Sequence, residues 1–143
     1  MKTKIEWLKE MTFDVELNGH HFMIDANEKV GGKNRGPSPK PLLLSSLVGC
    51  TGMDVVSILE KMKVNDYNFY INAEADLTNE HPKVFSEIRV NYIFTGNDLP
   101  QNKILKAIDL SENRYCGVSA MLKKTCPIKY NVFINDKLIR GEA

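Results

Sequence analysis

The sequence predicts an α+β protein in which a mainly antiparallel sheet wraps around one long central helix. Several short segments alternate between apolar and polar residues, which is typical of strands with one buried face. One longer segment, residues 42–63, instead repeats its apolar residues with the period of a helix. The length of 143 residues suits a single domain, residues 1–143, with one core.

Three strands are predicted near the N-terminus, at residues 2–8, 11–17 and 21–25. Asn18-Gly19 lies between the last two and is a strong signal for a tight turn. Residues 27–41 follow and contain three glycines and three prolines among scattered charges. This composition predicts a loop, and its length suggests that the loop is functional.

The segment 42–63 is the clearest helix, and its first half is apolar on nearly every side. Such a helix is expected to be buried on every side. A small domain seldom encloses a helix completely by itself. The helix is therefore either cradled by a curved sheet or shared with a second subunit, and we favour a C2 homodimer.

The second half of the chain predicts a hairpin, two helices and a last strand. The hairpin strands are residues 68–77 and 84–94, the short helix is 117–124, and the final strand is 126–134. Between them, Asn97 or Asp98 is expected to cap a helix with Pro100 in its first turn, which runs to about Leu110.

The composition excludes several function classes. The chain has 19 Lys and Arg against 18 Asp and Glu, a net charge of +1, so it has no electrostatic footprint for nucleic acid or an anionic membrane. Its first residues lack the apolar core of a signal peptide. The most apolar stretch, 42–56, is interrupted by polar residues and is shorter than the ~20 residues of a membrane span. We expect a cytoplasmic protein, in which three cysteines are not a structural disulfide framework.

Cys50 lies in the middle of the predicted long helix, and Asp54 follows one turn later. A cysteine inside a helix is often only a small apolar residue. A reactive role is favoured here because Gly49 and Gly52 leave the sulfur with little side-chain cover, and because the preceding loop could leave a channel to it.

Cys116 precedes the predicted helix 117–124, so its thiol is expected at a helix N-terminus, where free N–H groups favour the thiolate. Cys126 precedes a proline at the start of a strand and is given a structural role. Zinc binding by cysteines and histidines is disfavoured, because no pair has zinc-knuckle spacing and adjacent histidines in a strand point to opposite faces. The residues considered for that site are Cys50, Cys116, Cys126, His20 and His21.

These segments resemble the OsmC/Ohr family, the osmotically inducible and organic hydroperoxide resistance proteins, and within it an OsmC-like subgroup. The resemblance covers nearly the whole chain. It rests on the proline-bearing loop 36–41, the GCTGMDVVSIL helix around Cys50, the YCGVSAML segment around Cys116, and the terminal strand CPIKYNVFI. It implies an intertwined homodimer with two sheets wrapped around a pair of central helices.

The resemblance also implies a thiol peroxidase that reduces organic hydroperoxides and, more weakly, hydrogen peroxide. Cys50 would be the peroxidatic cysteine that becomes a sulfenic acid, and Cys116 the resolving cysteine that condenses with it to a disulfide. A lipoyl-type dithiol would restore both thiols. No metal, flavin or haem is implied.

One departure from the family pattern concerns the residues that poise the thiolate. The family places a glutamate shortly before the helix, where it orients an arginine, whereas this chain has Lys40 or Pro41 there. Arg35, Lys40 and Asp54 are the candidates for stabilising the Cys50 thiolate, and solvated loop charge is the alternative interpretation of Arg35 and Lys40. The lost glutamate motivates a second hypothesis, a non-catalytic dimeric stress-associated binding protein with an apolar ligand pocket.

Overall fold

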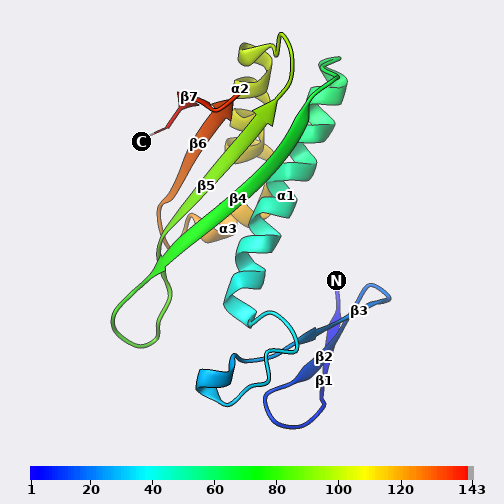
Figure 1. Cartoon of the computed structure of the whole chain (residues 1–143), viewed down its shortest axis with the longest axis vertical. Coiled ribbons are helices and arrows are strands. Elements are labelled where there is room, and N and C mark those ends of the chain that lie inside the picture. Colours follow the sequence, from blue (N-terminus) through cyan, green and yellow to red (C-terminus); the bar gives the residue numbers. More distant parts are fainter. Residues whose placement is uncertain (142–143) are drawn as a thin grey trace. The chain divides into compact units, whose positions relative to one another are not determined.

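The computed structural model describes residues 1–141, which form two compact units that divide between Leu43 and Leu44. The first unit contains a three-stranded antiparallel sheet in the order β1-β2-β3 (Figure 1). Its strands are β1 Thr3–Trp7, β2 Phe13–Leu17 and β3 His20–Ile24. The predicted tight turn is confirmed, because Asn18 and Gly19 both have positive φ, 51° and 79°.

The predicted loop of the first unit is ordered around Asp25. Its buried carboxylate accepts the backbone N–H groups of Ala26, Lys33 and Arg35, at 2.8 to 3.1 Å. These hydrogen bonds hold the pKa of Asp25 below its ordinary value, although burial acts against them. A short 3₁₀ helix, η1 Glu28–Val30, lies inside this loop and was not predicted.

The second unit contains a four-stranded sheet in the order β4-β5-β6-β7. Its strands are β4 Asn68–Leu77, β5 Phe85–Thr95, β6 Ile128–Ile134 and β7 Lys137–Arg140. The pairing is antiparallel except for the central pair β5 and β6, which is parallel. The prediction of a mainly antiparallel sheet is therefore confirmed, while β7 was missed because it is short.

The helices are α1 Pro39–Lys61, α2 Gln101–Leu110, the π-helical turn η2 Ser111–Tyr115, and α3 Gly117–Leu122. Within the second unit they lie on one face of the sheet (Figure 1). The expected cap of α2 is wrong: Pro100 is the N-cap, it makes no side-chain cap, and Asp98 has a positive φ of 49° in the turn before it. The turn η2 was not predicted.

The helix α1 begins at Pro39, three residues before the predicted start at Leu42. Proline is tolerated in a first helical turn, because the N–H groups of that turn have no intrahelical partner. The helix ends at Lys61, and Lys63 already has a positive φ of 54°. The prolines therefore led to the prediction of a loop over residues 39–41, which are in fact the first residues of α1.

One row of α1 side chains forms the core of the second unit with the sheet. Its members are buried and spaced four residues apart: Leu47, Thr51, Val55 and Leu59. The three apolar members, Leu47, Val55 and Leu59, share one apolar cluster with the β5 residues. Those β5 residues are Ile88, Val90, Tyr92 and Phe94, and all are fully buried. Gly52 lets the helix approach closely, because a Cβ at this position would lie 3.1 Å from the Cδ1 atom of Ile71.

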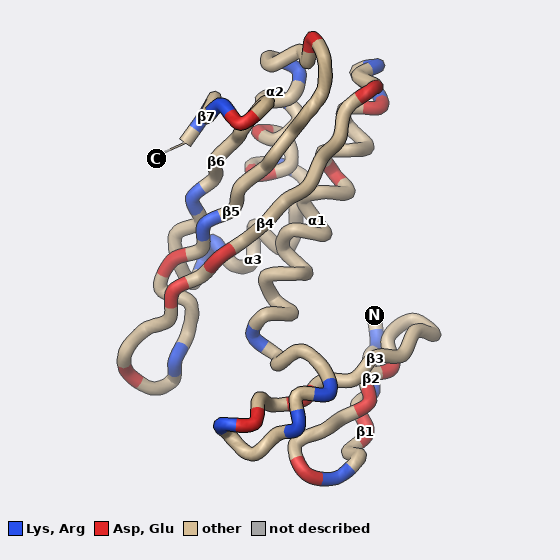
Figure 2. The backbone as a smooth tube through the Cα atoms, in the orientation of Figure 1, with Lys and Arg blue, Asp and Glu red and all other residues tan. Residues whose placement is uncertain are grey.

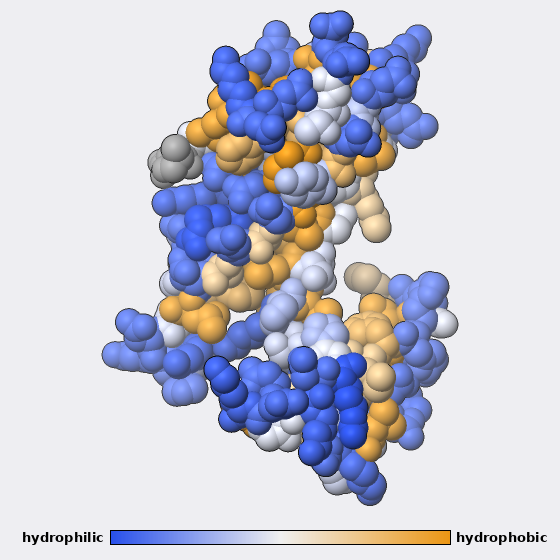
Figure 3. All heavy atoms as spheres, in the orientation of Figure 1, coloured by the Kyte–Doolittle hydropathy of each residue, from blue (hydrophilic) through white to orange (hydrophobic). Residues whose placement is uncertain are grey.

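The expectation that α1 is buried on every side is wrong for the single chain. Met53 and Val56 are 76% and 45% exposed, and Figure 3 shows other apolar residues exposed among polar ones. By length and composition alone the 23-residue helix could cross a membrane. The sequence did not indicate this, because only the apolar stretch 42–56 was considered and it is shorter than a membrane span. Core helices of soluble proteins meet the same criterion, and α1 packs one row of side chains against the sheet.

Acidic and basic residues are interleaved along both units (Figure 2).

We expect Leu59→Ala to lower the free energy of unfolding by about 2–5 kcal/mol, because it removes a fully buried side chain from the core and leaves a cavity. The neighbouring exposed Glu60 provides the control, and Glu60→Ala should change stability by no more than about 0.5 kcal/mol. Urea denaturation measures both. Equal midpoints for the two variants would contradict the packing of α1.

Candidate functional site

The second unit brings together three side chains from two separate elements. Cys50 and Asp54 lie one turn apart on α1, and Cys116 is the N-cap residue of α3. The two sulfur atoms and a carboxylate oxygen of Asp54 all lie within 4.8 Å of one another. The fold therefore joins the two thiols whose pairing the family resemblance implies, although they are remote in the sequence.

Cys116 occupies the position at which η2 ends and α3 begins. Its backbone N–H donates to the carbonyl oxygen of Ser111 at 2.9 Å, which closes the π-helical turn. Its sulfur accepts the backbone N–H of Ser119 at 3.4 Å, and the residue is only 3% exposed. The predicted place of this thiol at the start of a helix is confirmed.

Cys50 is half-buried, and its surroundings act on its pKa in opposite directions. Burial raises the pKa of the Cys50 thiol, and the neighbouring Cys116 and Asp54 raise it further. The backbone N–H of Val118 donates a hydrogen bond to Cys50 and lowers the pKa. Asp54 was a candidate for stabilising the Cys50 thiolate, and this expectation is wrong because its negative charge opposes a second negative charge nearby.

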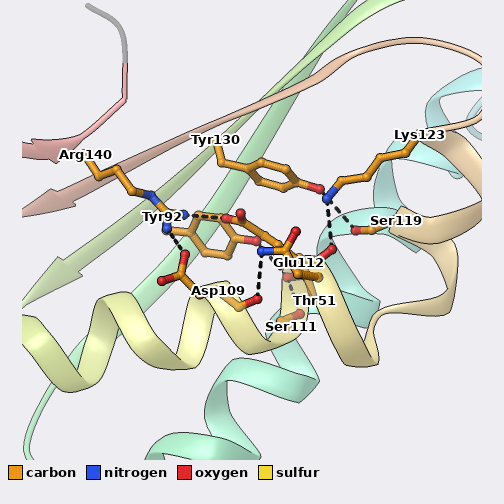
Figure 4. Close-up of polar contacts among 10 residues, drawn as sticks. Thr51, Tyr92, Asp109, Ser111, Glu112, Ser119, Lys123, Tyr130 and Arg140 are labelled. Carbon is orange, nitrogen blue, oxygen red and sulfur yellow. Dashed lines mark hydrogen bonds and ion pairs between the residues drawn. The ribbon is translucent and has the colours of Figure 1, made fainter.

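Asp54 is held by a chain of buried hydroxyl groups. The hydroxyl of Ser111 donates to Asp54 Oδ2 at 3.0 Å, and it lies 2.8 Å from Thr51 Oγ1. Thr51 Oγ1 in turn lies 2.7 Å from the Tyr92 hydroxyl, and burial raises the pKa of Tyr92 far above its ordinary value. Since each hydroxyl has one proton, Tyr92 donates to Thr51, Thr51 to Ser111, and Ser111 to the carboxylate. Figure 4 shows Tyr92, Thr51 and Ser111 converging from a strand, a helix and the π-helical turn.

This hydroxyl chain could not be predicted from the sequence. Thr51 and Tyr92 carry no local signature, and Ser111 lies in a turn that was not predicted. The i, i+4 spacing of Cys50 and Asp54 was the one visible sign that a polar group enters this side of α1.

A second polar cluster holds η2 in place. Arg140 on β7 makes ion pairs with Asp109 and Glu112, and Lys123 Nζ donates to the Glu112 carbonyl oxygen at 2.9 Å (Figure 4). Burial raises the pKa of Glu112 to about 7, against the lowering effect of the Arg140 and Lys123 charges. These contacts fix the turn that leads into Cys116.

An open groove of about 330 Å³ adjoins the cysteine cluster and shares Asp54 with it. Its walls are mostly apolar, with Ser57, Lys61 and Asp54 as the polar members. The apolar lining residues are Ile58, Met62, Leu110 and Tyr115. A small apolar molecule in this groove would lie next to Asp54.

Arg35 and Lys40 belong to the first unit. The Arg35 guanidinium donates from Nη1 to Thr12 Oγ1 at 3.3 Å and lies 3.6 Å from Glu10 Oε2. Lys40 is exposed in the first turn of α1. The role of either cation at the thiolate stays a prediction.

The remaining candidates for a metal site do not join Cys50 and Cys116 in one group of ligands. Cys126 is 5% exposed and packs in the apolar core. His21 lies on the surface of the first unit, with Nδ1 2.8 Å from Asp14 Oδ2. Across residues 1–141, the potential metal ligands that gather closely are Cys50, Asp54 and Cys116.

We expect Asp54→Asn to lower the pKa of the Cys50 thiol, because the substitution removes a negative charge that disfavours the thiolate. The test uses a parent chain that carries Cys116→Ser and Cys126→Ser, so that Cys50 is the only thiol. At a pH below the pKa of Cys50, adding Asp54→Asn should raise the rate of Cys50 alkylation by iodoacetamide several-fold over that of the parent. Glu60→Gln on the same helix is the control. If the alkylation rate of Asp54→Asn depends on pH as that of the parent does, the Asp54 carboxylate does not repel the Cys50 thiolate.

Comparisons with known proteins agree with this architecture. Residues 31–131 match the family model described as OsmC-like protein. The chain is 32% identical over 132 residues to Protein YhfA of Escherichia coli K12, which covers 92% of this chain and 96% of that protein. A crystal structure of a hypothetical protein from Aquifex aeolicus is 27% identical, with a TM-score of 0.78 and coverage of 94% and 96%. A crystal structure of an organic hydroperoxide resistance protein OsmC from Legionella pneumophila is 16% identical, with a TM-score of 0.67 and coverage of 92% and 94%. The chain therefore belongs to the family of OsmC-like proteins.

Proposed function

We propose that this protein is a thiol-dependent peroxidase that reduces organic hydroperoxides and, more weakly, hydrogen peroxide. The observation that carries the proposal is the approach of Cys50 and Cys116, whose sulfurs lie within 4.8 Å of each other beside an apolar groove. Two thiols at that separation can be oxidised together to a disulfide, which supplies the two electrons that reduce one hydroperoxide. The structural likeness to an organic hydroperoxide resistance protein supports the fold for such chemistry.

The half-buried Cys50 is the peroxidatic residue in this proposal, and Cys116 is the resolving one. The Cys50 thiolate attacks the distal oxygen of the hydroperoxide, so that an S–O bond forms while the O–O bond breaks. The alkoxide leaves and takes a proton to become the alcohol, and Cys50 is left as a sulfenic acid. The sulfur supplies both electrons, and no other redox group takes part.

Cys116 completes the turnover in a second step. Its thiolate attacks the sulfenic sulfur, the S–S bond forms, and the oxygen leaves as water after taking a proton. A lipoyl-type dithiol then reduces the disulfide by thiol–disulfide exchange and becomes the cyclic disulfide itself. The resolving thiol needs little movement, because a disulfide of about 2.0 Å replaces a separation that is already within 4.8 Å.

The hydrogen bond from the Val118 N–H is the stabilising influence on the Cys50 thiolate within the second unit, against burial and two acidic neighbours. The raised pKa of Cys50 favours the second candidate function, a non-catalytic binding protein. In that alternative the groove beside Asp54 holds a small apolar ligand and the thiols stay reduced.

The protein is also proposed to work as a cytoplasmic homodimer. The exposed apolar residues of α1, Met53 and Val56, lie on a helix whose opposite row fills the core. A second copy that packs on this side would bury the helix all round, as its apolar sequence indicates. Dimerisation would thus remove the largest exposed apolar side chain of α1 from water.

We expect Cys50→Ser to abolish the consumption of cumene hydroperoxide in the presence of dihydrolipoamide, down to the rate with reductant alone. Cys116→Ser should complete one turnover and then accumulate a Cys50 oxidised by one or more oxygen atoms, each adding about 16 Da in intact-protein mass spectrometry. Wild type treated with one equivalent should instead lose about 2 Da as the disulfide forms.

Cys126→Ser is the matched control, because this buried thiol lies outside the cluster, and it should keep wild-type turnover. Equal peroxide consumption by wild type and Cys50→Ser would sink the peroxidase proposal. In that case, saturable binding of an apolar ligand by Cys50→Ser would favour the binding protein instead.

Light scattering after gel filtration tests the dimer. We expect the wild type to have twice the chain mass, and the double variant Met53→Glu, Val56→Glu to shift towards the monomer because it places two charges in an apolar interface. Lys106→Glu on the exposed surface of α2 changes the net charge by the same amount and should leave the dimer intact. A wild type that elutes as a monomer at micromolar concentration would contradict the dimer.

A further inference from the structure

We propose that reduced Cys50 and Cys116, together with Asp54, form a binding site for Zn²⁺. Spacing in the sequence disfavours zinc, because the cysteines lack zinc-knuckle spacing, and the carboxylate of Asp54 was not among the ligands considered there. The inference needs only that both thiols are reduced. It does not require peroxidase activity.

The geometry of the three ligand atoms is close to what zinc requires. Zinc binds thiolate sulfur at about 2.3 Å and carboxylate oxygen at about 2.0–2.2 Å in a tetrahedral arrangement. These lengths place two sulfurs about 3.8 Å apart and a sulfur and an oxygen about 3.5 Å apart. The three atoms already lie within 4.8 Å of one another, so rotations of the side chains by small amounts would complete the site.

The chemistry of the ligand set selects the metal. Two soft thiolates with one carboxylate suit Zn²⁺ and disfavour Mg²⁺ and Ca²⁺, which prefer oxygen ligands alone. Three protein ligands leave a fourth tetrahedral position for water. Asp54 also lines the open groove, so solvent has a path to the cluster from that side.

The electrostatics of the cluster favour a divalent cation. The ligand atoms of two thiols and one carboxylate lie within 4.8 Å of one another, so their negative charges would oppose one another when no cation lies between them. Zinc would convert that repulsion into attraction and would release the two thiol protons. Affinity for the metal should therefore fall as the pH is lowered, since protons compete for the sulfurs.

The surroundings already orient the ligands. The Ser111 hydroxyl donates to Asp54 Oδ2, and the buried Thr51 and Tyr92 hold Ser111 in turn. Backbone N–H groups of Val118 and Ser119 donate to the sulfurs of Cys50 and Cys116. Outer hydrogen bonds of this kind fix the direction of ligand atoms and commonly contribute 10- to 100-fold to metal affinity, as an order of magnitude.

The state of the thiols would control such a site. A disulfide between Cys50 and Cys116 removes both thiolates, so the oxidised protein would release the metal. Conversely, bound Zn²⁺ would occupy the sulfur lone pairs and hold the thiols back from electrophiles. Zinc would therefore act as a reversible block of this pair of cysteines.

The test is an anaerobic titration of the reduced full-length protein with Zn²⁺ by calorimetry, with Co²⁺ as a spectroscopic probe. We expect one metal ion per chain, and for Co²⁺ the visible bands of a tetrahedral site with a thiolate charge-transfer band. Cys50→Ser and Cys116→Ser should each weaken zinc binding by at least about 100-fold. Each substitution deletes one of the two thiolates. It should therefore halve the charge-transfer band where Co²⁺ still binds through the other thiolate, and abolish the band where Co²⁺ no longer binds.

Two further variants test the carboxylate and its support. Asp54→Asn should weaken zinc binding, and Ser111→Ala should weaken it by about 10-fold while the circular dichroism of the protein stays unchanged. Cys126→Ser is the matched cysteine control, and the double variant His20→Ala, His21→Ala is the control for binding at the first unit. Both should bind zinc as the wild type does.

Wild-type affinity that survives Cys50→Ser or Cys116→Ser would overturn the inference, as would zinc binding that disappears in the histidine variant. Peroxide consumption by the metal-free wild type is measured in parallel. Zinc binding without peroxidase activity would leave this inference standing and remove the proposed function, whereas activity without zinc binding would do the reverse.

Discussion

Ser111 is the residue on which the arrangement of the cysteine cluster depends. Its hydroxyl joins Thr51 and Asp54, both on α1, and its carbonyl oxygen accepts the backbone N–H of Cys116. One fully buried serine thus ties the helix that carries the first thiol to the turn that delivers the second. A buried hydroxyl with every bond satisfied fixes relative positions more tightly than apolar contact does, because apolar contact has no direction.

The same network creates a conflict at the reactive sulfur. Asp54 is kept beside the thiols by Ser111, and its charge makes the Cys50 thiolate harder to form. A fold that required only a reactive thiolate would gain from a neutral residue there. A carboxylate at this position is better explained when the cluster also has to meet a positive charge, such as that of a metal ion.

The architecture could be predicted from the sequence because its elements have strong periodic patterns. The strands β4 and β5 alternate cleanly, and the Asn18-Gly19 turn has one conformation that suits it. The errors have particular causes. Prolines at the start of α1 resembled a loop, β7 is too short to show a pattern, and the π-helical turn at Ser111 has no sequence signal. The cysteines were recognised from their local contexts, but the sign of the Asp54 effect depends on three-dimensional proximity, which spacing along one helix does not give.

The parallel pairing of β5 with β6 has a consequence for biosynthesis. Parallel neighbours cannot be joined by a tight turn, so the chain between Thr95 and Ile128 must cross over the sheet, and this connection contains Cys116. As the chain leaves the ribosome, Cys50 and the hairpin emerge first, and β6 has to emerge before the crossover is anchored at both ends. The nascent protein therefore carries the Cys50 thiol without its partner until α1, the hairpin β4-β5 and α2 have all been synthesised.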